Sequence, residues 1–243
     1  MRIRSLAGIV FALAAAPFLW GESPERAVVV GTAGFDFPPT LVACDILAEA
    51  YDRIGYRADF VDFPPNRMIA LLKKGEIDAL ILAEASFKDK YPGTIMVPTE
   101  IWTDELVVYS KRTLDVTGWE SIKTLTVGYI AGMIIIEKSL SNGFDAVPVQ
   151  TPTQLFEMLN AGRTDAVVTS RSIGQYMLPK LDMKGISPAG KTLALVPNYH
   201  FLAGNNAELA ARLSAALADM ERTGRIAAIT KASLARILPD GER

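Results

Sequence analysis

One pattern of hydrophobic and polar positions occurs at two places in the chain. Residues 60–83 read FVDF, PPN, RMIALLKKG and EIDALILA, and residues 147–170 read VPVQ, TPT, QLFEMLNAG and RTDAVVTS. In each copy a short apolar run leads through a proline turn into a segment with apolar residues three and four positions apart, which predicts an amphipathic helix. A glycine ends the helix, and a second apolar run predicts a buried strand. The chain therefore contains a duplicated strand–helix–strand unit.

The spacing of the two copies predicts two similar α/β lobes. The copies are offset by 87 residues, whereas solenoid repeats are shorter and need at least three copies to be stable. The continuous apolar runs at 27–32 and 125–130 predict the first buried strand of each lobe, as expected for parallel sheets covered on both faces.

Two further apolar runs, 105–110 and 193–197, predict strands that cross between the lobes. With these crossings, lobe 1 is expected to hold residues 27–108 and 196–243, and lobe 2 residues 109–195. A cleft between two lobes is a common place for a small molecule to bind. We therefore expect a small-molecule site between the lobes.

The first 21 residues have a different pattern. Arg2 and Arg4 precede an uncharged apolar run from Leu6 to Leu19. This run is shorter than a comfortable membrane span, and the pattern is typical of a secretory signal peptide. We expect residues 1–21 to be a signal peptide and the mature chain to reside in the periplasm; an uncleaved membrane anchor is the alternative.

Composition and charge exclude several classes of function. Hydrophobic residues make up 50% of the chain and charged residues 21%, which is typical of a globular protein. The net charge is −2, or −4 without the two arginines of the first segment, so no basic excess suggests nucleic-acid binding. With Cys44 as its one cysteine and with one histidine, the chain has neither an intrachain disulfide nor a Cys-rich or His-rich metal site. We expect a monomer without cofactor or metal.

The order of these parts resembles the bacterial extracellular solute-binding proteins of family 3, which are periplasmic receptors that deliver polar amino acids to ABC importers. The resemblance extends over nearly all of the mature chain. It implies an α/β, two-lobed periplasmic binding protein type II fold, in which each lobe is an open α/β sheet with flanking helices and a two-strand hinge joins the lobes. It also implies capture of a small polar ligand, amino-acid-like or a small organic anion, for an ABC transporter membrane permease. The residues that carry it are the loop 35–39, the two Gly-x-x-Asp-Ala turns, the segment 121–132 and the helix 208–224.

This chain differs from the family at the positions that hold the ligand. The arginine that pairs with the ligand carboxylate corresponds to Lys90, which provides a point charge without the guanidinium fork. The acid that holds the ligand amino group corresponds to Ser170, and the family's Gly-Thr pair corresponds to Gly132 and Met133. The resemblance therefore implies the fold but does not imply an ordinary α-amino acid as the ligand.

Candidate ligand contacts lie at the predicted strand ends and at the starts of the helices that follow. Arg67 and Arg171 are alternative cations for an anionic group of the ligand, and Glu84 is an acid able to face a ligand amine. Aromatic side chains would cover the apolar part of the ligand. The candidate set is Phe35, Arg67, Ala83, Lys90, Trp102, Tyr129, Gly132, Ser170 and Arg171.

Two other functions use the same scaffold. Some relatives of the family are dehydratases that act on cyclohexadienyl acids, and such chemistry needs a general acid near the leaving group. Glu84 and Glu100 are the acids that we place near the cleft, but the chain has no Gly-x-Ser-x-Gly elbow. We expect a binding protein and not an enzyme. A module that reports the ligand to a membrane partner is the other alternative.

Overall fold

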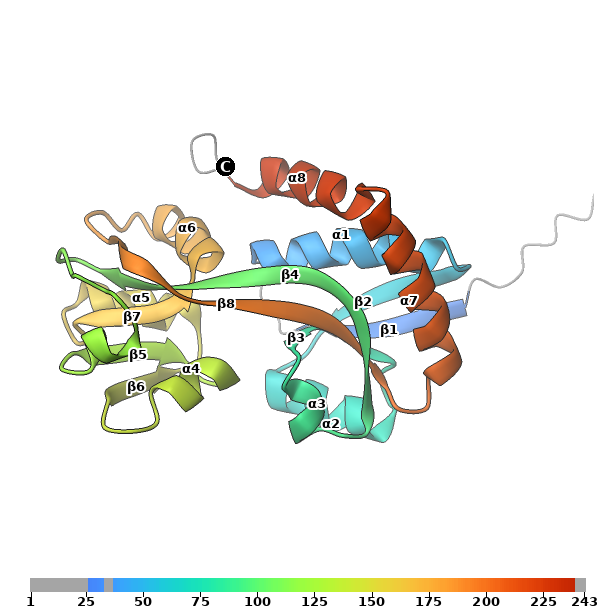
Figure 1. Ribbon diagram of the computed structural model, residues 1–243, viewed down its shortest axis with the longest axis horizontal. Coiled ribbons are helices and arrows are strands. Elements are labelled where there is room, and N and C mark those ends of the chain that lie inside the picture. The colour runs from blue at the N-terminus through green and yellow to red at the C-terminus, as the bar shows by residue number, and fades with distance from the viewer. Residues whose placement is uncertain (1–25, 33–36, 239–243) are drawn as a thin grey trace, which may run out of the picture.

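The computed structural model describes residues 26–32 and 37–238. The expected signal peptide and Phe35 lie outside the described residues. Within these ranges, no helix is both long enough and apolar enough to cross a membrane. The described chain forms two lobes joined by two long strands (Figure 1).

Lobe 1 contains three parallel strands with helices on both faces. A 15-residue helix, α1 (Pro38–Asp52), begins with two prolines, which suit the first turn because no N–H is needed there. The C-terminal helices α7 (Ala207–Arg222) and α8 (Arg225–Ile237) pack back on this lobe, as expected. The other elements are β1 (Arg26–Thr32), β2 (Tyr56–Asp62), α2 (Pro65–Lys74), β3 (Ala79–Glu84) and α3 (Phe87–Lys90).

Lobe 2 has the same plan on a smaller scale. Its strand β5 pairs in parallel with β6 on one side and β7 on the other. The elements are the 3-10 turn η1 (Trp119–Ile122), β5 (Thr126–Ile130), α4 (Ile134–Ser139), β6 (Asp145–Val149), α5 (Pro152–Asn160), β7 (Ala166–Ser170) and α6 (Arg171–Lys180).

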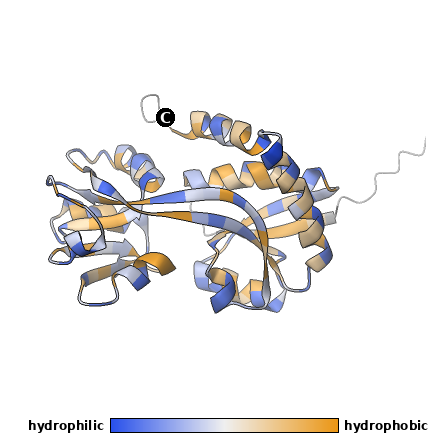
Figure 2. Ribbon diagram, viewed as in Figure 1, coloured by the Kyte–Doolittle hydropathy of each residue, from blue (hydrophilic) through white to orange (hydrophobic). Residues whose placement is uncertain are grey.

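Two antiparallel strands run through both lobes and connect them (Figure 1). These are β4 (Thr94–Ser110) and β8 (Ser187–Ala203), and they join the lobes into one mixed sheet with strand order β2-β1-β3-β8-β4-β7-β5-β6. Each is much longer than the crossing strands expected from the apolar runs at 105–110 and 193–197. Where β4 passes between the lobes it carries the polar residues Thr103, Asp104 and Glu105, so an apolar run alone does not reveal its full length; Figure 2 shows hydrophilic and hydrophobic stretches alternating along the two crossing strands.

Hydrogen bonding confirms that the strand–helix–strand unit is duplicated. In the first copy Asp78 accepts a hydrogen bond from the backbone N–H of Val29 at 2.9 Å, and in the second copy Asp165 accepts one from the N–H of Thr126 at 3.0 Å. Each aspartate thus ties the turn of its unit to the first strand of its lobe. Gly75, which ends α2, has the left-handed φ of 70° that favours glycine at this place.

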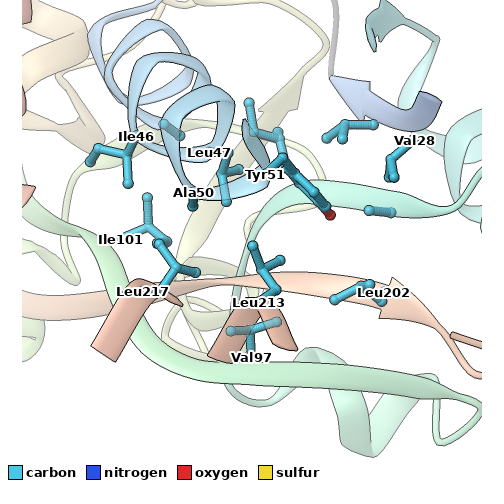
Figure 3. Packing of buried hydrophobic residues seen from close by; sticks show 14 of the residues in the cluster. Val28, Ile46, Leu47, Ala50, Tyr51, Val97, Ile101, Leu202, Leu213 and Leu217 are labelled. Atoms are coloured by element: carbon cyan, nitrogen blue, oxygen red, sulfur yellow. The ribbon is translucent and has the colours of Figure 1, made fainter. Parts of the chain in front are cut away.

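In the described chain, each lobe has a hydrophobic cluster on both faces of its sheet. In lobe 1, Val28 and Val30 of β1 face the cluster under α1 and α7, whereas Val29 lies on the opposite face with α2 and α3. This alternation follows from the two-residue period of a strand. Figure 3 shows Tyr51 of α1 and Leu213 of α7 in the first cluster. Packing on both faces fixes the strand ends where the two lobes meet.

Candidate functional site

A cleft of about 330 Å³ lies between the two lobes. Lobe 1 contributes the end of β3 and the first turns of α1 and α2, lobe 2 contributes the β5–α4 turn and the starts of α5 and α6, and β4 and β8 contribute residues between them. Strand β3, which is parallel to β1 in lobe 1, and strand β5, which is parallel to β7 in lobe 2, therefore point their carboxyl ends at the same space. Open α/β sheets bind ligands at such strand ends.

The duplicated unit places matching residues on opposite walls of the cleft. Pro65 begins α2 in the first copy and Pro152 begins α5 in the second, and both line the cleft. Because the strand before each helix ends on the same side of its lobe, the two copies present their helix starts to the shared space. The two walls are thus similar in backbone and differ in side chains.

The walls of the cleft are mostly apolar. Isoleucine is the most frequent lining residue, and Phe37 adds an aromatic ring that packs edge to face against Tyr176 of α6, with ring centroids 6.1 Å apart. This contact joins the start of α1 in lobe 1 to lobe 2 beside the cleft. The apolar residues of the two walls include Met68, Ile69, Ile130, Met133, Ile134 and Ile173.

A strip of three polar side chains crosses the cleft on adjacent strands. Asn198 of β8 pairs in register with Glu84 of β3 on one side, and on the other side its Nδ2 donates a hydrogen bond to Asp104 of β4 at 3.2 Å. Asn198 Nδ2 also donates to the backbone oxygen of Val196 at 2.9 Å. Glu84 accepts a hydrogen bond from the hydroxyl of Ser86 at 2.9 Å. These three side chains, here called the polar strip, all line the cleft.

Asp104 has a carboxyl whose pKa is shifted by its surroundings. Burial raises the pKa of its carboxyl above the ordinary value, and hydrogen bonds from Ser170, Trp102 and Asn198 oppose the shift. Trp102 Nε1 donates one of these bonds to Asp104 at 3.1 Å. A carboxylate in this position is partly removed from water and its hydrogen-bond donors are neutral groups, so a positive charge in the cleft would stabilise its ionised form.

Solved structures share this architecture. One is a histidine kinase sensor domain described as similar to periplasmic binding proteins, with a TM-score of 0.76, 22% identity, and coverage of 88% of this chain and 99% of that one. This chain has the type II periplasmic binding protein fold. An ancestral arginine-binding protein bound to arginine shares the fold with a TM-score of 0.72, 19% identity, and coverage of 88% and 99%. A probable amino-acid ABC transporter extracellular-binding protein from Bacillus subtilis does so with a TM-score of 0.70, 19% identity, and coverage of 89% and 100%.

No protein-family model and no curated protein sequence matches the chain. The identities to the solved structures are near 20%, so these likenesses establish the fold and leave the ligand to be argued from the cleft. The predicted two-lobed α/β architecture of the periplasmic binding protein type II fold is confirmed.

Within this binding-protein fold, four of the predicted ligand contacts lie in or directly behind the cleft. Ala83 and Gly132 line it from opposite lobes. Trp102 and Ser170 do not line it, but both hydrogen-bond to Asp104, which does. Glu84, considered in the sequence as a partner for a ligand amine, lines it as well.

The predicted cations lie elsewhere. Arg67 is exposed on α2, and Lys90 is exposed at the end of α3, with its Nζ 5.8 Å from the ring centroid of Tyr91. Arg171 donates from Nε and Nη2 to the two carboxylate oxygens of Glu105, both at 2.8 Å. Of the described residues that line the cleft, none is lysine, arginine or histidine.

The remaining candidates lie outside the cleft or outside the described residues. Tyr129 is half-buried against a hydrophobic cluster of lobe 2. Glu100 is exposed and does not line the cleft. Phe35 lies outside the described residues, although its neighbour Phe37 lines the cleft. In the described ranges, no group of three or more His, Cys, Asp and Glu side chains is arranged to hold a metal ion.

Sequence reasoning missed Asp104 and Asn198. They are 94 residues apart, and they meet because β4 and β8 pair over their full length. The only local signal is the two-residue spacing of Trp102 and Asp104, which puts them on one face if the segment is a strand. That signal does not identify the partner strand or its register.

Proposed function

We propose that this chain is a periplasmic receptor that captures a small molecule between its two lobes and releases it unchanged. The observation that carries the proposal is the position of the cleft, which is walled by strand ends and helix starts of both lobes, while within residues 26–32 and 37–238 the chain passes between the lobes only along β4 and β8. A ligand in the cleft makes all its contacts only when the lobes are together. It therefore shifts the population toward the closed arrangement by its difference in affinity for the two arrangements.

The contacts beside the cleft are compatible with opening and closing. The aromatic pair of Phe37 and Tyr176 joins the lobes next to the cleft, and such a pair contributes only about 0.5–1.5 kcal/mol beyond its buried area. The ion pair of Glu105 and Arg171 joins the lobe 2 end of β4 to the start of α6. Glu105 also accepts a hydrogen bond from the hydroxyl of Thr192 of β8 at 2.5 Å. The pair braces the end of the hinge without bridging the cleft.

We propose delivery of the ligand to the permease of an ABC importer as the role of the receptor. The fold shared with an extracellular binding protein of an amino-acid ABC transporter supports it. Reporting the ligand to a membrane partner is the second candidate, and the likeness to a histidine kinase sensor domain favours it. In a strain lacking the gene, lost uptake of the labelled ligand supports delivery, whereas intact uptake with a lost transcriptional response supports sensing.

Ligand-dependent closure tests the receptor function. Residues 22–243 would be screened by thermal unfolding against amino acids, amines and small organic acids, and each hit followed by small-angle X-ray scattering. A ligand at a hundredfold excess over its Kd stabilises the native state by about 2.7 kcal/mol, and we expect a smaller radius of gyration as well. Ala83→Leu fills the cleft and is expected to abolish both effects.

The matched control is Ala85→Leu, two residues further along and exposed outside the cleft. It adds the same side chain and is expected to leave binding unchanged. Equal binding by both leucine variants would contradict a site in the cleft. Binding without any change in the radius of gyration would contradict closure of the lobes.

A further inference from the structure

We propose that the ligand of this cleft is an organic cation with an apolar body, such as a primary amine without a carboxylate, and that the polar strip of Glu84, Asn198 and Asp104 holds its positive group. This inference deepens the proposed receptor function and rests on it. Its first support is the sign of the charges. Among the described residues the lining of the cleft includes two carboxylates and no cation.

The geometry of the polar strip suits an ammonium group. Glu84 and Asn198 are cross-strand neighbours, and such neighbours have Cβ atoms about 4.5–5.5 Å apart. Asn198 donates from Nδ2 to Asp104 and to the oxygen of Val196, so its amide orientation is fixed by two acceptors and Oδ1 is left as an acceptor. A carboxylate, an amide oxygen and a second carboxylate thus lie on three adjacent strands. An ammonium group carries three N–H donors and no acceptor.

The local electrostatics also favour a cation. Burial raises the pKa of Asp104, and the side chains that hydrogen-bond to it, Ser170, Trp102 and Asn198, are uncharged. A second carboxylate, Glu84, lines the same cleft. A cation in the cleft can be stabilised by these two carboxylates through charge-assisted hydrogen bonds.

The walls and the volume describe the rest of the ligand. Around the polar strip the cleft is lined by isoleucine, methionine and phenylalanine side chains, which suit an aliphatic or aromatic body. At roughly 30 Å³ for each water-sized group, a volume of about 330 Å³ accommodates about ten non-hydrogen atoms. The volume of the cleft is therefore compatible with a small amine.

An α-amino acid fits this cleft less well. Its carboxylate would enter a space that already holds two carboxylates. Arg171, which the sequence offers as a counter-ion, instead makes two hydrogen bonds to Glu105. Arg67 and Lys90 are exposed and do not line the cleft. The absence of a cation among the described lining residues is thus the feature that favours an amine over an amino acid as the ligand.

A matched series of probes tests the charge requirement by isothermal titration calorimetry on residues 22–243. The series is 2-phenylethylamine, isopentylamine, L-phenylalanine, 3-phenylpropanoate and 2-phenylethanol. We expect one or both amines to bind, L-phenylalanine to bind at least about tenfold more weakly than 2-phenylethylamine, and the carboxylate without an amine not to bind. The neutral alcohol measures the contribution of the apolar walls alone.

Variants of the polar strip locate the positive group. Glu84→Gln removes one charge-assisted hydrogen bond and is expected to weaken amine binding by about tenfold to a hundredfold. Asp104→Asn is expected to do the same. Glu76→Gln, on an exposed acid of lobe 1 outside the cleft, is the control and is expected to leave the affinity unchanged. Far-UV circular dichroism of each variant checks that it folds.

The outcomes separate this inference from the receptor function. If L-phenylalanine or 3-phenylpropanoate binds more tightly than the amine and Ala83→Leu abolishes that binding, the receptor function stands and the cationic ligand is wrong. Amine binding that Glu84→Gln and Asp104→Asn leave unchanged would also overturn the inference. If neither this series nor the wider screen produces binding or closure, both proposals fail.

Discussion

The single histidine of the chain offers a sharp test of how the core of lobe 1 is built. His200 lies on β8, is fully buried, and packs against Tyr51 of α1. Its Nδ1 lies 3.2 Å from the backbone oxygen of Ile81, and its Nε2 lies 2.8 Å from the hydroxyl of Tyr51. Because a carbonyl oxygen only accepts, Nδ1 carries the proton and Nε2 accepts from the tyrosine. Both ring nitrogens are thus satisfied in the neutral form.

The magnitude of the effect follows from the pKa. Burial lowers the pKa of His200 from 6.5 to about 4. Between these two values the unfolded chain binds a proton that the native state does not bind, so stability rises with pH and is lost as the pH falls from about 6.5 to about 4. At about 1.4 kcal/mol per pKa unit, His200 should account for a loss of about 3 kcal/mol over this range.

Urea unfolding at several pH values between 7 and 4 measures the effect. His200→Gln is the matched variant, because glutamine offers one donor and one acceptor but does not titrate. The carboxylates titrate equally in both proteins, so the difference between their stability–pH curves isolates the histidine. We expect the parent protein to lose about 3 kcal/mol more than the variant. Parallel curves would refute a buried neutral imidazole at this position.

Two other predictions concern packing and charge. Gly174→Ala in α6 would place a Cβ 2.1 Å from a ring atom of Tyr109, so we expect the free energy of unfolding measured in urea to fall by about 1–2 kcal/mol. The control is Gly118→Ala, whose Cβ would have no heavy atom within 4 Å. Equal stability of the two variants would contradict the close contact at Gly174. The Arg171 hydrogen bond lowers the pKa of Glu105, so the pair stabilises at neutral pH and this contribution is lost as the pH falls through the lowered pKa. Because about a third of each side chain is exposed, we expect Glu105→Gln to cost less than about 1 kcal/mol at pH 7, and a cost that persists at pH 3 would point to packing instead.

The duplicated unit was predictable from the sequence because its signals are local. The helix period, the proline at each helix start and the glycine at each helix end all lie within 24 residues of each other. Asp78 and Asp165, matched in the sequence, make the same backbone contact in the two lobes. A local pattern that occurs twice is strong support for two lobes, and from two lobes a cleft follows.

The chemistry of the cleft was not predictable in the same way. Asp104 and Asn198 lie just outside the apolar runs 105–110 and 193–197 that predict strands, so hydrophobicity does not mark these two residues as part of the strands. Their meeting depends on the register of two strands far apart in the chain. Arg171, which looked available for a ligand, is paired with Glu105, a residue that sequence reasoning did not connect with it. The signal peptide, the part played by Phe35 and the permease partner stay predictions.

The cleft is built partly by the two duplicated units and partly by the hinge strands β4 and β8, and this division suggests how its specificity can change independently of the fold. Pro65 and Pro152, from the duplicated units, set the backbone of the two walls. The residues that follow the two units differ, since Glu84 lines the cleft while its counterpart, Arg171, is paired with Glu105. The other charged group, Asp104, comes from a hinge strand that has no copy. Because the three strip residues do not belong to the buried hydrophobic clusters, exchanging one or two of them is expected to alter the charge preference for the ligand while both cores are retained. On the proposed reading, the type II fold is kept while the cleft presents acids where a carboxylate ligand would need a cation.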